Sequence, residues 1–325
     1  MKILLTGGAG FIGHNVTRYL VEQNHTCEII DSFTDYSFIP KEEMAYLTAK
    51  RTKRMMGTVC HRLDIRNQTK IASVVNRFDP EVIIHLASFP RQKIVSTNPA
   101  YASEVMSTGL INLLELSQGR KFVYISSSMV YGDFTDDVTE DYNCKPQGQY
   151  GIMKLMGEHL VQDYTRRGCF DHVIIRPSAV YGELDVEDRV VSKFMLTAMR
   201  GEVLKVHGAN EVLDFTYVED AAQGIASAAV SDQARNKIYN ITKSHSTSLL
   251  QAAELAVKIA GKGSIEVRDK DADFPSRGAL NIDAARRDFG FDPKIDVEEG
   301  FQRYHAWFNS STYWGDRIRN VNRTK

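Results

Sequence analysis

Tyr150 and Lys154 form the clearest pair of side chains in this sequence whose types and spacing suit chemistry. They stand four residues apart and therefore share one face of a helix. A nearby ammonium lowers the pKa of a phenol from about 10, which makes the phenolate a usable base. This spacing alone fits an incidental pair on an amphipathic helix. The run from Ser126 to Gly132 favours a site, because its hydroxyls follow a predicted strand and can hydrogen-bond the same substrate oxygen as Tyr150.

A glycine-rich turn lies between the first predicted strand, residues 2–6, and a helical pattern over residues 14–22. Gly7 permits the tight turn, Gly10 lets the backbone approach a pyrophosphate, and Gly13 allows close packing of the helix. The unpaired amides and partial positive charge of a helix N-terminus suit phosphate groups. The predicted cofactor residues of this turn are Gly7, Gly10, Phe11, Ile12 and Gly13.

The next predicted strand ends at Asp31, whose carboxylate can accept hydrogen bonds from an adenosine ribose. Ser32 and Phe33 follow it, without an arginine to receive a 2′-phosphate, so the sequence predicts NAD and not NADP. Asp64 and Ile65 follow the third predicted strand and place a carboxylate near the adenine amino group and an apolar wall beside the ring. A helix cap is an equal interpretation of Asp64. For the whole site, the alternative is a structural turn followed by a solvated aspartate.

Short β-rich segments alternate with helical stretches through the first half of the chain. This alternation predicts an α/β fold with a doubly wound parallel (Rossmann) sheet, in which ligands bind at the carboxyl ends of the strands. The predicted strands cover residues 2–6, 26–31, 61–63, 82–86, 121–126 and 172–176.

After Pro177 the alternation loosens, and the second half predicts a smaller mixed α/β C-terminal substrate lobe. No internal repeat or low-complexity linker separates the halves, so we expect the lobes to be interleaved. The predicted elements are a helix at 190–200, a strand pair at 203–207 and 214–218, and a strand at 237–241. The predicted domains are an NAD-binding Rossmann domain, residues 1–176 plus about 211–244, and a substrate lobe, about 177–210 plus 245–325.

The overall charge gives no reason to expect a polyanionic partner. Forty Lys and Arg residues against 41 Asp and Glu give a net charge of −1, so nothing global draws the chain to nucleic acid or an anionic membrane. A charged helical segment at 40–56 has a cluster of four cations toward its end, but two glutamates dilute its charge and no aromatic pattern for base stacking accompanies it. These cations are Lys50, Arg51, Lys53 and Arg54.

The sequence contains neither a predicted signal segment nor a predicted membrane span. The apolar run between Lys2 and Thr6 has three residues, and no stretch approaches the roughly 20 apolar residues that a bilayer span needs. The four cysteines lack CxxC spacing, which argues against a disulfide scaffold and a metal site. We therefore expect a cytoplasmic protein with reduced thiols.

The sequence resembles the extended short-chain dehydrogenases/reductases, and among them the nucleotide-sugar epimerases and dehydratases. The resemblance covers almost the whole chain and rests on several motifs taken together. These motifs run from Gly7 to Gly13, His85 to Ser88, Ser126 to Gly132, Tyr150 to Lys154, Arg176 to Gly182 and Asp214 to Asp220.

By this resemblance, Tyr150 is the catalytic base, Lys154 binds the nicotinamide ribose and lowers the pKa of the tyrosine, and Ser127 is the catalytic hydroxyl. The implied mechanism removes the proton of the C4 hydroxyl of the sugar while the C4 hydride passes to NAD, which leaves a 4-keto sugar. The hydride is then returned, so the cofactor is not consumed. The implied cofactor channel is lined by Leu86, Ala87 and Ser88.

Dehydratases of this kind carry an acid just after the catalytic Ser or Thr, where this sequence has Ser128 and Met129. Neither side chain can act as an acid or base, so the sequence disfavours 4,6-dehydration and favours C4 epimerisation with tightly bound NAD. Rotation of the keto sugar leaves no motif, so a nucleotide-sugar 4-dehydrogenase or 4-keto reductase is the alternative. An NAD-binding regulatory protein without turnover is a third interpretation, which an intact Tyr150, Lys154 and Ser127 disfavour.

Two positions depart from the family pattern. Leu213 replaces the arginine that commonly grips the diphosphate of the sugar nucleotide, and Met106 replaces an asparagine near the cofactor. Another cation must then contact the diphosphate, although each candidate alone also fits a solvated surface cation. Arg91 and Lys93 face either the substrate or solvent. The predicted substrate site comprises Ser127, Ser128, Met129, Arg189, Lys193 and Arg277.

The resemblance also implies partners for the chain. The first is a nucleotide-diphosphate sugar as substrate. The second is another copy of the chain, because relatives often pair two helices from each subunit in a four-helix interface. The helices predicted at 99–118 and 149–166 would form this homodimer, although their apolar residues fit a core equally well.

Overall fold

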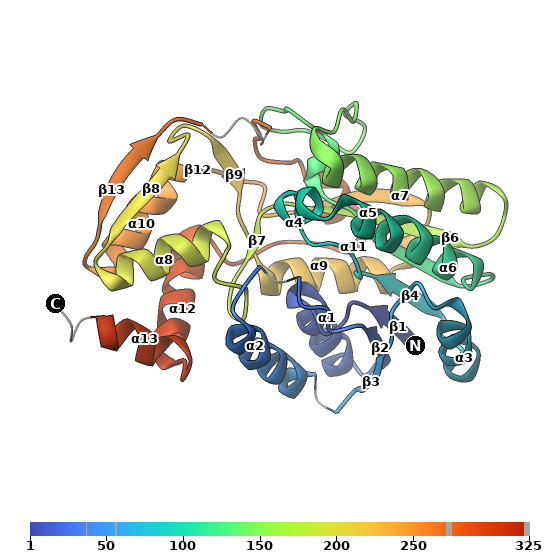
Figure 1. Cartoon of the computed structure of the whole chain (residues 1–325). Helices are drawn as coiled ribbons and strands as arrows, with labels where there is room; N and C mark the ends of the chain where they lie inside the picture. The colour runs from blue at the N-terminus through green and yellow to red at the C-terminus, as the bar shows by residue number, and fades with distance from the viewer. Residues whose placement is uncertain (37, 56, 271–274, 322–325) are drawn as a thin grey trace.

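A seven-stranded parallel sheet forms the centre of the computed structural model, which describes residues 1–36, 38–55, 57–270 and 275–321 (Figure 1). Its strands follow the order β11-β6-β5-β4-β1-β2-β3. Each strand predicted in the first half is present to within two residues, and the doubly wound sheet is confirmed. The strands are β1 (Lys2–Thr6), β2 (Thr26–Asp31), β3 (Val59–Arg62), β4 (Val82–His85), β5 (Lys121–Ile125), β6 (Asp171–Pro177) and β11 (Lys237–Ile241).

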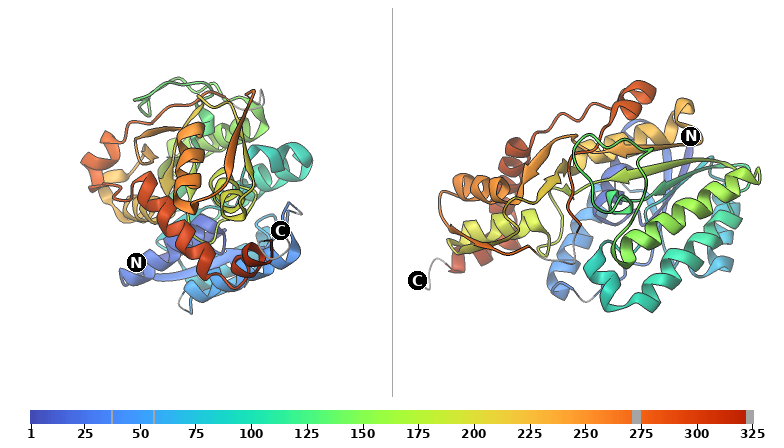
Figure 2. Two further views of the ribbon diagram at one scale, coloured as in Figure 1. Left: turned by 90° about the vertical axis from the view of Figure 1, so that its left-hand side faces the viewer. Right: turned by 90° about the horizontal axis from the view of Figure 1, so that it is seen from above.

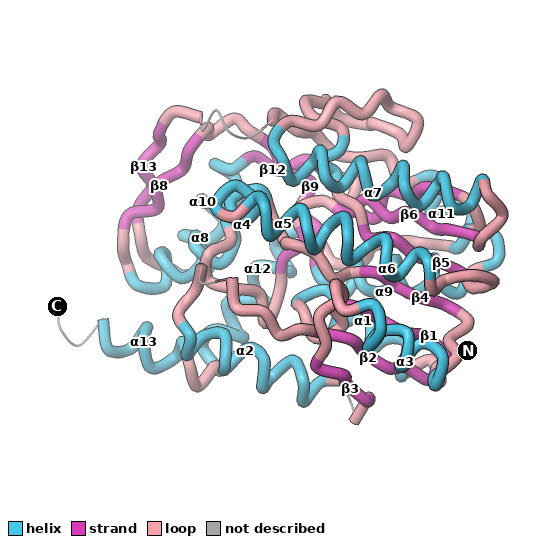
Figure 3. The backbone as a smooth tube through the Cα atoms, turned by 45° about the vertical axis from the view of Figure 1, so that its right-hand side comes forward, coloured by secondary structure: helices cyan, strands magenta, loops and turns pink. Residues whose placement is uncertain are grey.

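Helices cover both faces of this sheet because its central strands are apolar on both sides. In β1, Ile3 and Leu5 belong to the core under one helical layer and Leu4 to the core under the other. The first layer contains α1 (Phe11–Glu22), α9 (Val218–Val230) and α11 (Asp283–Phe289). The second contains α3 (Gln68–Phe78), α4 (Gln92–Thr97), α5 (Pro99–Ser103), a π-helical turn η1 (Glu104–Thr108), α6 (Gly109–Glu115) and α7 (Gly148–Arg166) (Figures 1 and 3).

The smaller lobe lies at one end of the sheet, at the left of Figure 1 and of the right view of Figure 2, and toward the viewer in the left view of Figure 2. Its core forms between amphipathic helices, with Trp314 wholly buried, and Leu47 of α2 (Lys41–Arg54) joins it from the other lobe. The lobe is mixed α/β, as predicted. Its elements are α8 (Val190–Arg200), β8 (Val203–His207), α10 (Leu249–Ala260), β13 (Ser264–Arg268), α12 (Val297–Ser310) and α13 (Trp314–Val321).

The predicted pairing of residues 203–207 with 214–218 is wrong. β8 pairs in parallel with β13, a partner much later in the chain, which leaves no local sequence pattern. The chain leaves its strand after Asp214, which is wholly buried and accepts the N–H groups of His245 and Leu280. Two pairs of short strands lie here: β7 (Val180–Tyr181) pairs with β10 (Thr216–Tyr217), and β9 (Val212–Asp214) pairs with β12 (Ser246–Ser248). Elsewhere in the described residues there are two short 3-10 turns, η2 (Ser128–Val130) and η3 (Asp232–Ala234).

The chain passes back and forth between the two lobes. The edge strand β11 follows the first elements of the smaller lobe, and α11 returns later to cover it, with Phe291 packed beside Gly224 of α9. The domain bounds stay a prediction, and residues 271–274 and 322–325 of the predicted substrate lobe lie outside the described residues. In the part of the chain that the structure describes, no helix is long and apolar enough to span a bilayer. The cytoplasmic location stays a prediction.

Candidate active site

One cavity of about 1100 Å³ contains every residue that the sequence predicts for the cofactor, catalysis and the substrate. Its wall combines the glycine turn, segments after β2, β4 and β5, the start of α7, and loops of the smaller lobe. This is the edge at which the carboxyl ends of parallel strands place ligands. The structure therefore brings the predicted site residues together, while their individual roles stay predictions.

The glycine turn shapes the cofactor end of this cavity by close backbone contacts. Gly7 has a φ of 70°, and a Cβ there would lie 2.6 Å from the backbone nitrogen of Ala87. A Cβ on Gly13 would lie 2.3 Å from the carbonyl oxygen of Gly7. A Cβ on Gly10 would meet only that oxygen, at 3.1 Å, so this position is otherwise open. The backbone at the start of α1 is thus accessible to a dinucleotide pyrophosphate, and the residues present fit NAD.

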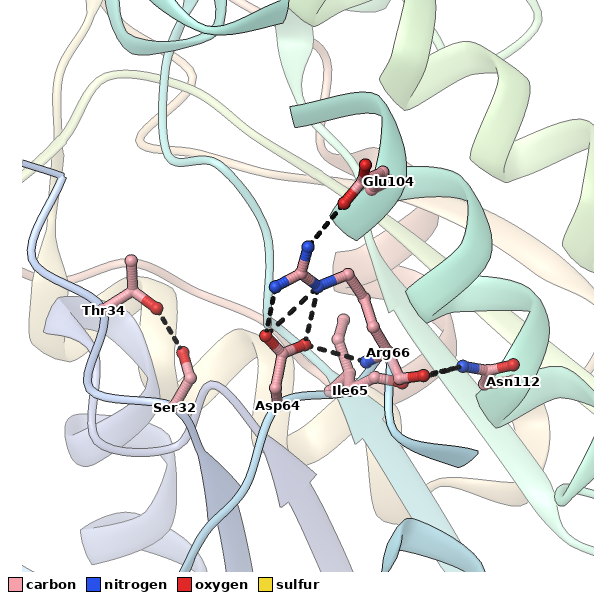
Figure 4. A network of polar contacts seen from close by, with 7 residues as sticks. All are labelled: Ser32, Thr34, Asp64, Ile65, Arg66, Glu104 and Asn112. Carbon is pink, nitrogen blue, oxygen red and sulfur yellow. Dashed lines mark hydrogen bonds and ion pairs between the residues drawn. The ribbon is translucent and has the colours of Figure 1, made fainter. Parts of the chain in front are cut away.

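Asp31 is held in place by two main-chain amides. Its carboxylate accepts the N–H of Ala9 at 3.0 Å and that of Phe33 at 2.8 Å. Burial raises the pKa of Asp31, and these two hydrogen bonds oppose the rise. A carboxylate has about four acceptor positions, so two remain for the hydroxyls of a ribose. The hydroxyls of Ser32 and Thr34, 2.6 Å apart, lie beside it (Figure 4).

Asp64 and Ile65 form the next part of the cofactor end, where a network of polar contacts holds them. The guanidinium of Arg66 donates to both carboxylate oxygens of Asp64 and keeps the pKa of that carboxyl below its usual range. Arg66 also contacts Glu104 of η1, and Asn112 donates to the carbonyl of Ile65 (Figure 4). The Asp64 carboxylate therefore has a fixed orientation at the cavity wall.

Two other interpretations of this region are now decided. Asp64 is not the cap of α3, because Asn67 occupies the N-cap position and accepts the N–H of Lys70 at 3.1 Å. Met106, where an asparagine is usual, is 3% exposed and packs in the core under the second helical layer. It therefore contributes apolar packing and no hydrogen bond to the cofactor region.

The segment after β4 forms the wall between the two ends of the cavity. Leu86 and Ala87 line it, and Ala87 lies against Gly7 of the glycine turn. The carbonyl of Ser88 accepts the hydroxyl of Tyr36 at 3.2 Å. This segment is thus anchored on both sides, which agrees with its predicted place beside the cofactor.

Tyr150, Lys154 and Ser127 meet at the wall where α7 faces the end of β5. Ser127 precedes η2, and its hydroxyl accepts the N–H of Met129 at 3.2 Å. Tyr150 lies in the first turn of α7, and its N–H donates to the side chain of Gln92 at 2.9 Å. The side chain of Ser127 lies close enough to Tyr150 to oppose the rise of its pKa. The two hydroxyls can therefore act on one substrate oxygen.

The pKa of Tyr150 differs from the prediction. Burial raises it, while the side chain of Ser127 and the charge of Arg189 oppose the rise. Lys154 is 4% exposed, donates from Nζ to the carbonyl of Ile125 at 2.7 Å, and lies 5.9 Å from the ring centroid of Tyr150. Burial also lowers the pKa of Lys154 to about 7. The ammonium is therefore only partly populated near neutrality, so little positive charge remains there to lower the pKa of the phenol.

A buried ion pair fixes the wall that carries these residues. Arg176, at the end of β6, donates to the two carboxylate oxygens of Glu158 at 2.9 and 2.6 Å, and both side chains are at most 4% exposed. The hydroxyl of Ser126 donates to the same carboxylate. Glu158 lies one turn after Lys154, so this pair ties α7 to the strand ends beside Ser127. Loss of one partner of such a pair costs about 3–5 kcal/mol.

The three cations predicted for the substrate diphosphate have different partners. Arg189 lies 3.6 Å from Asp185, and Lys193 forms an ion pair with Asp188. Arg277 forms no ion pair within the described residues, and its buried Nε has no hydrogen bond there. Burial, and then repulsion from Arg189, lower the pKa of Arg277 to about 10. An anion placed between these two guanidinium groups would remove the repulsion and supply the missing acceptor.

Asp188 contacts the two loop cations, Arg91 and Lys93, for which the sequence allowed a position facing either the substrate or solvent. Arg91 contacts its carboxylate at 2.6 Å and Lys93 at 3.8 Å. Both side chains line the cavity together with Leu213, which carries no charge. Arg277 is thus the cation of this region whose charge is least compensated.

Comparison with known proteins decides the family. A model described as the NAD dependent epimerase/dehydratase family matches residues 3–242, which is more than half of the chain. The chain belongs to this family. The resemblance found in the sequence and the NAD cofactor are therefore confirmed.

Members of both branches of the family are similar to this chain. A putative UDP-glucose 4-epimerase of Methanocaldococcus jannaschii is 30% identical over 322 residues, which cover 95% of this chain and 99% of that protein. The dTDP-glucose 4,6-dehydratase 1 of Escherichia coli K12 is 26% identical, with 98% and 96% covered. A crystal structure of UDP-glucuronic acid 4-epimerase from Bacillus cereus, in complex with UDP-glucuronic acid and NAD, has a TM-score of 0.86 at 25% identity, with 94% and 98% covered.

Sequence reasoning missed three residues in this family member's site. Gln92 and Asp188 act through contacts between distant loops, and no local pattern marks them. Arg51 had a readable signal. Glu43, Leu47 and Arg51 recur every four residues and form the buried face of α2, so the segment at 40–56 is an amphipathic helix and not only a charged insertion. Met56 of that segment lies outside the described residues.

Proposed function

We propose that this protein is a nucleotide-sugar 4-epimerase that works through a transient 4-keto sugar and retains its NAD. The observation that carries the proposal is the meeting of the hydroxyls of Ser127 and Tyr150 at one wall of the cavity, with Lys154 one turn along α7. Bound NAD supplies a hydride acceptor at its nicotinamide ring. The protein must then hold the sugar, move one proton and exclude water.

The proton belongs to the C4 hydroxyl of the sugar. Ser127 holds that oxygen, and Tyr150 takes the proton and later returns it from the same position. Ser127 is 8% exposed, so bulk water has little access to this hydroxyl. Lys154 is anchored by the carbonyl of Ile125, which sets its position relative to Tyr150. Burial raises the pKa of Tyr150 in the protein without ligands, so bound NAD and sugar must lower it before the phenolate can take this proton.

Ser128 and Met129 support epimerisation over dehydration. They occupy the two positions after the catalytic hydroxyl and are 1% and 7% exposed. A serine and a thioether cannot supply the acid or base that expels water across C5 and C6. The diphosphate of the substrate would bind at Arg277 with Arg189, and Lys193 would lie at its edge. The similarity to a glucuronic acid 4-epimerase of known structure supports a UDP-sugar as the first substrate to test.

Product analysis tests this proposal. The purified protein is incubated with UDP-, GDP-, CDP- and dTDP-sugars, and products are followed by mass and NMR together with NADH absorbance. We expect an isomer of unchanged mass without net NADH. A product two mass units lighter with accumulating NADH would make the enzyme a 4-dehydrogenase. Loss of 18 mass units would establish a dehydratase instead, and inactivity with every sugar would favour a regulatory NAD-binding protein.

We also propose a homodimer formed by α6 and α7. Ile111 on α6 is 38% exposed and Ile152 on α7 is 54% exposed, and the two helices are neighbours in one layer (Figure 3). Ile152→Glu should give a monomer in sedimentation, because a charge in an apolar interface is strongly unfavourable. The control is Val203→Glu, a change of similar exposure, 49%, in the smaller lobe. A protein that is monomeric before mutation, or a dimer that survives Ile152→Glu, would exclude this interface.

A further inference from the structure

Arg51 is a buried cation on α2 that the proposed function does not use. Arg51 is 6% exposed, whereas the other cations near the C-terminus of α2 are mostly exposed to solvent. Its Nε and Nη2 donate to one carbonyl oxygen, that of Leu184, at 3.1 and 2.7 Å. A carbonyl satisfies two donors but does not balance the positive charge.

The carboxylates around Arg51 each contact another group, although Asp185 and Glu43 each keep one buried oxygen without a hydrogen bond among the described residues. Asp185 lies 3.6 Å from Arg189, Asp31 accepts two main-chain amides, and Glu43 accepts the N–H of Glu187 at 2.7 Å. Within the described ranges, no carboxylate oxygen comes within 4 Å of the Arg51 guanidinium. Buried charges in proteins are normally paired or bind a ligand. Asp185, Asp31 and Glu43 stabilise the charge of Arg51 only from a distance, so an anion from outside the chain would supply the ion pair that it lacks.

Arg51 faces the cofactor end of the cavity. It lines the cavity together with Gly10 and Phe11 at the start of α1, and α1 packs against α2. His14, in the second turn of α1, has its pKa lowered to about 3 by burial and then by the charge of Arg51, so the two side chains are close. The N-terminus of α1 is the place where the glycine turn receives a diphosphate. Helix amides and Arg51 thus converge on one anion.

We propose that Arg51 binds the diphosphate of NAD opposite the N-terminus of α1, and that the same side chain holds the loop of residues 182–189 that faces the substrate. A guanidinium suits both tasks, because its five donors are fixed in one plane and two of them already contact Leu184. The remaining donors are available to phosphate oxygens. The sugar-nucleotide diphosphate is the other possible anion, but Arg189 and Arg277 serve the end of the cavity away from α1.

The loop contact gives Arg51 a second consequence. Leu184 has a φ of 68°, a strained conformation for a side chain with a Cβ, and the two hydrogen bonds from Arg51 hold it. The same loop carries Asp185, Asp188 and Arg189. Bound NAD would fix Arg51, and Arg51 would fix this loop, so cofactor and sugar nucleotide should each raise the affinity for the other.

Calorimetric titration of the full chain, freed of bound nucleotide, tests the proposal. Arg51→Gln keeps a donor for Leu184 but removes the charge. We expect this substitution to weaken the binding of NAD and ADP-ribose by about 10- to 100-fold, since hydrogen bonds to charged groups contribute free energies of this size. Adenosine, which lacks phosphate, should bind within about twofold of the unmodified chain, because its contacts are unchanged. In Arg51→Lys, which keeps the charge without the planar fork, the loss should be smaller.

Arg54→Gln is the matched control. Arg54 lies one turn further along α2 and pairs with Glu183 of the same loop at 2.5 Å, but its side chain is 32% exposed and does not line the cavity. The substitution Arg54→Gln should therefore leave the affinity for NAD unchanged. A further arm measures UDP affinity with and without NAD, and the gain with NAD should disappear in Arg51→Gln only.

Two results would overturn the assignment. If Arg51→Gln weakens the binding of ADP-ribose and of adenosine equally, Arg51 has only a structural role. If it weakens the binding of UDP and leaves that of ADP-ribose unchanged, Arg51 belongs to the sugar-nucleotide site. Thermal unfolding of the nucleotide-free variants identifies a folding defect, in which case Arg51→Lys decides between these results. The titrations need no turnover, so they remain decisive if the protein proves not to be an epimerase.

Discussion

At the cofactor end of the cavity, main-chain groups determine the shape: three glycines bring backbone within 2.3 to 3.1 Å of where a Cβ would stand, and two amides orient Asp31. At the substrate end, long charged side chains from loops do this work, and Asp188 alone receives Arg91, Lys93 and Lys193. Backbone positions tolerate almost no variation, whereas paired side chains can be exchanged. The difference indicates that one dinucleotide is fixed by the fold while the sugar nucleotide is selected by replaceable contacts.

Substitution of Tyr150, which lies between the cofactor end and the substrate end of the cavity, should have the largest effect on activity. Tyr150→Phe removes the hydroxyl that moves the proton and should lower kcat by about 10²- to 10⁴-fold, the usual weight of general acid–base catalysis. NAD content should not change, because the ring and its packing remain. Steady-state kinetics and nucleotide released on denaturation measure the two quantities. A variant with unreduced turnover would show that the enzyme uses another base.

A backbone change should break the cofactor end alone. Gly13→Ala places a Cβ 2.3 Å from the carbonyl of Gly7, so we expect loss of bound NAD together with about 1–3 kcal/mol of stability from overpacking. Gly168→Ala is the control, since its φ of 77° imposes strain of about 1–2 kcal/mol in open space. Retention of NAD by Gly13→Ala, measured by absorbance of the released nucleotide, would contradict the backbone account.

A side-chain change should weaken the substrate end by less. Arg277→Met removes the uncompensated guanidinium and should raise KM for the sugar nucleotide about 10- to 100-fold, with kcat within a few-fold. Lys93→Met should have little effect, because Lys93 is 59% exposed and lies 3.8 Å from Asp188. Equal effects of the two changes would mean that overall positive charge, and not a specific contact, holds the diphosphate.

The smallest expected effect is on the free energy of unfolding, and it depends on pH through Glu43 at the junction of the two lobes. Burial raises the pKa of Glu43 to about 7, one of its oxygens has no hydrogen bond, and its residue is 0% exposed. The folded state therefore binds a proton more tightly than the unfolded state, so stability is lost as pH rises from about 4.5 to 7. Glu43→Gln removes this loss and should be about 1–3 kcal/mol more stable at pH 8 and unchanged below pH 4.5. Urea unfolding at both pH values checks this, and the same shift at both would refute it.

The fold was predictable where the signal is local. Most strands from β1 to β6 are apolar runs with recognisable ends, and the glycine turn has a fixed spacing, so both were found from the sequence. The pairing of β8 with β13 was not, because it joins segments far apart in the chain. The same limit applies to Gln92, which contacts Tyr150 across 58 positions.

The candidate site was predictable in its membership but not in its electrostatics. The predicted residues gather in one cavity because strand ends of a parallel sheet share an edge. The direction of the Tyr150 pKa shift was wrong, since spacing shows that Lys154 is near but not how deeply both are buried. Arg51 was read as one of four cations, although its spacing from Leu47 marked the buried face of α2.

The late return of α11 to the sheet also affects how the chain is made. All seven strands exist once residue 241 has been synthesised, and Ile241 can then pack against Gly224 of α9, but Tyr239 awaits Phe289 of α11 for its cover. About 50 further residues must follow, which takes roughly 3 to 10 s at ordinary rates of translation. During that interval the edge strand β11 is only partly covered, by α9. The interval in which this protein is most exposed to aggregation is therefore set by the order of its elements along the chain.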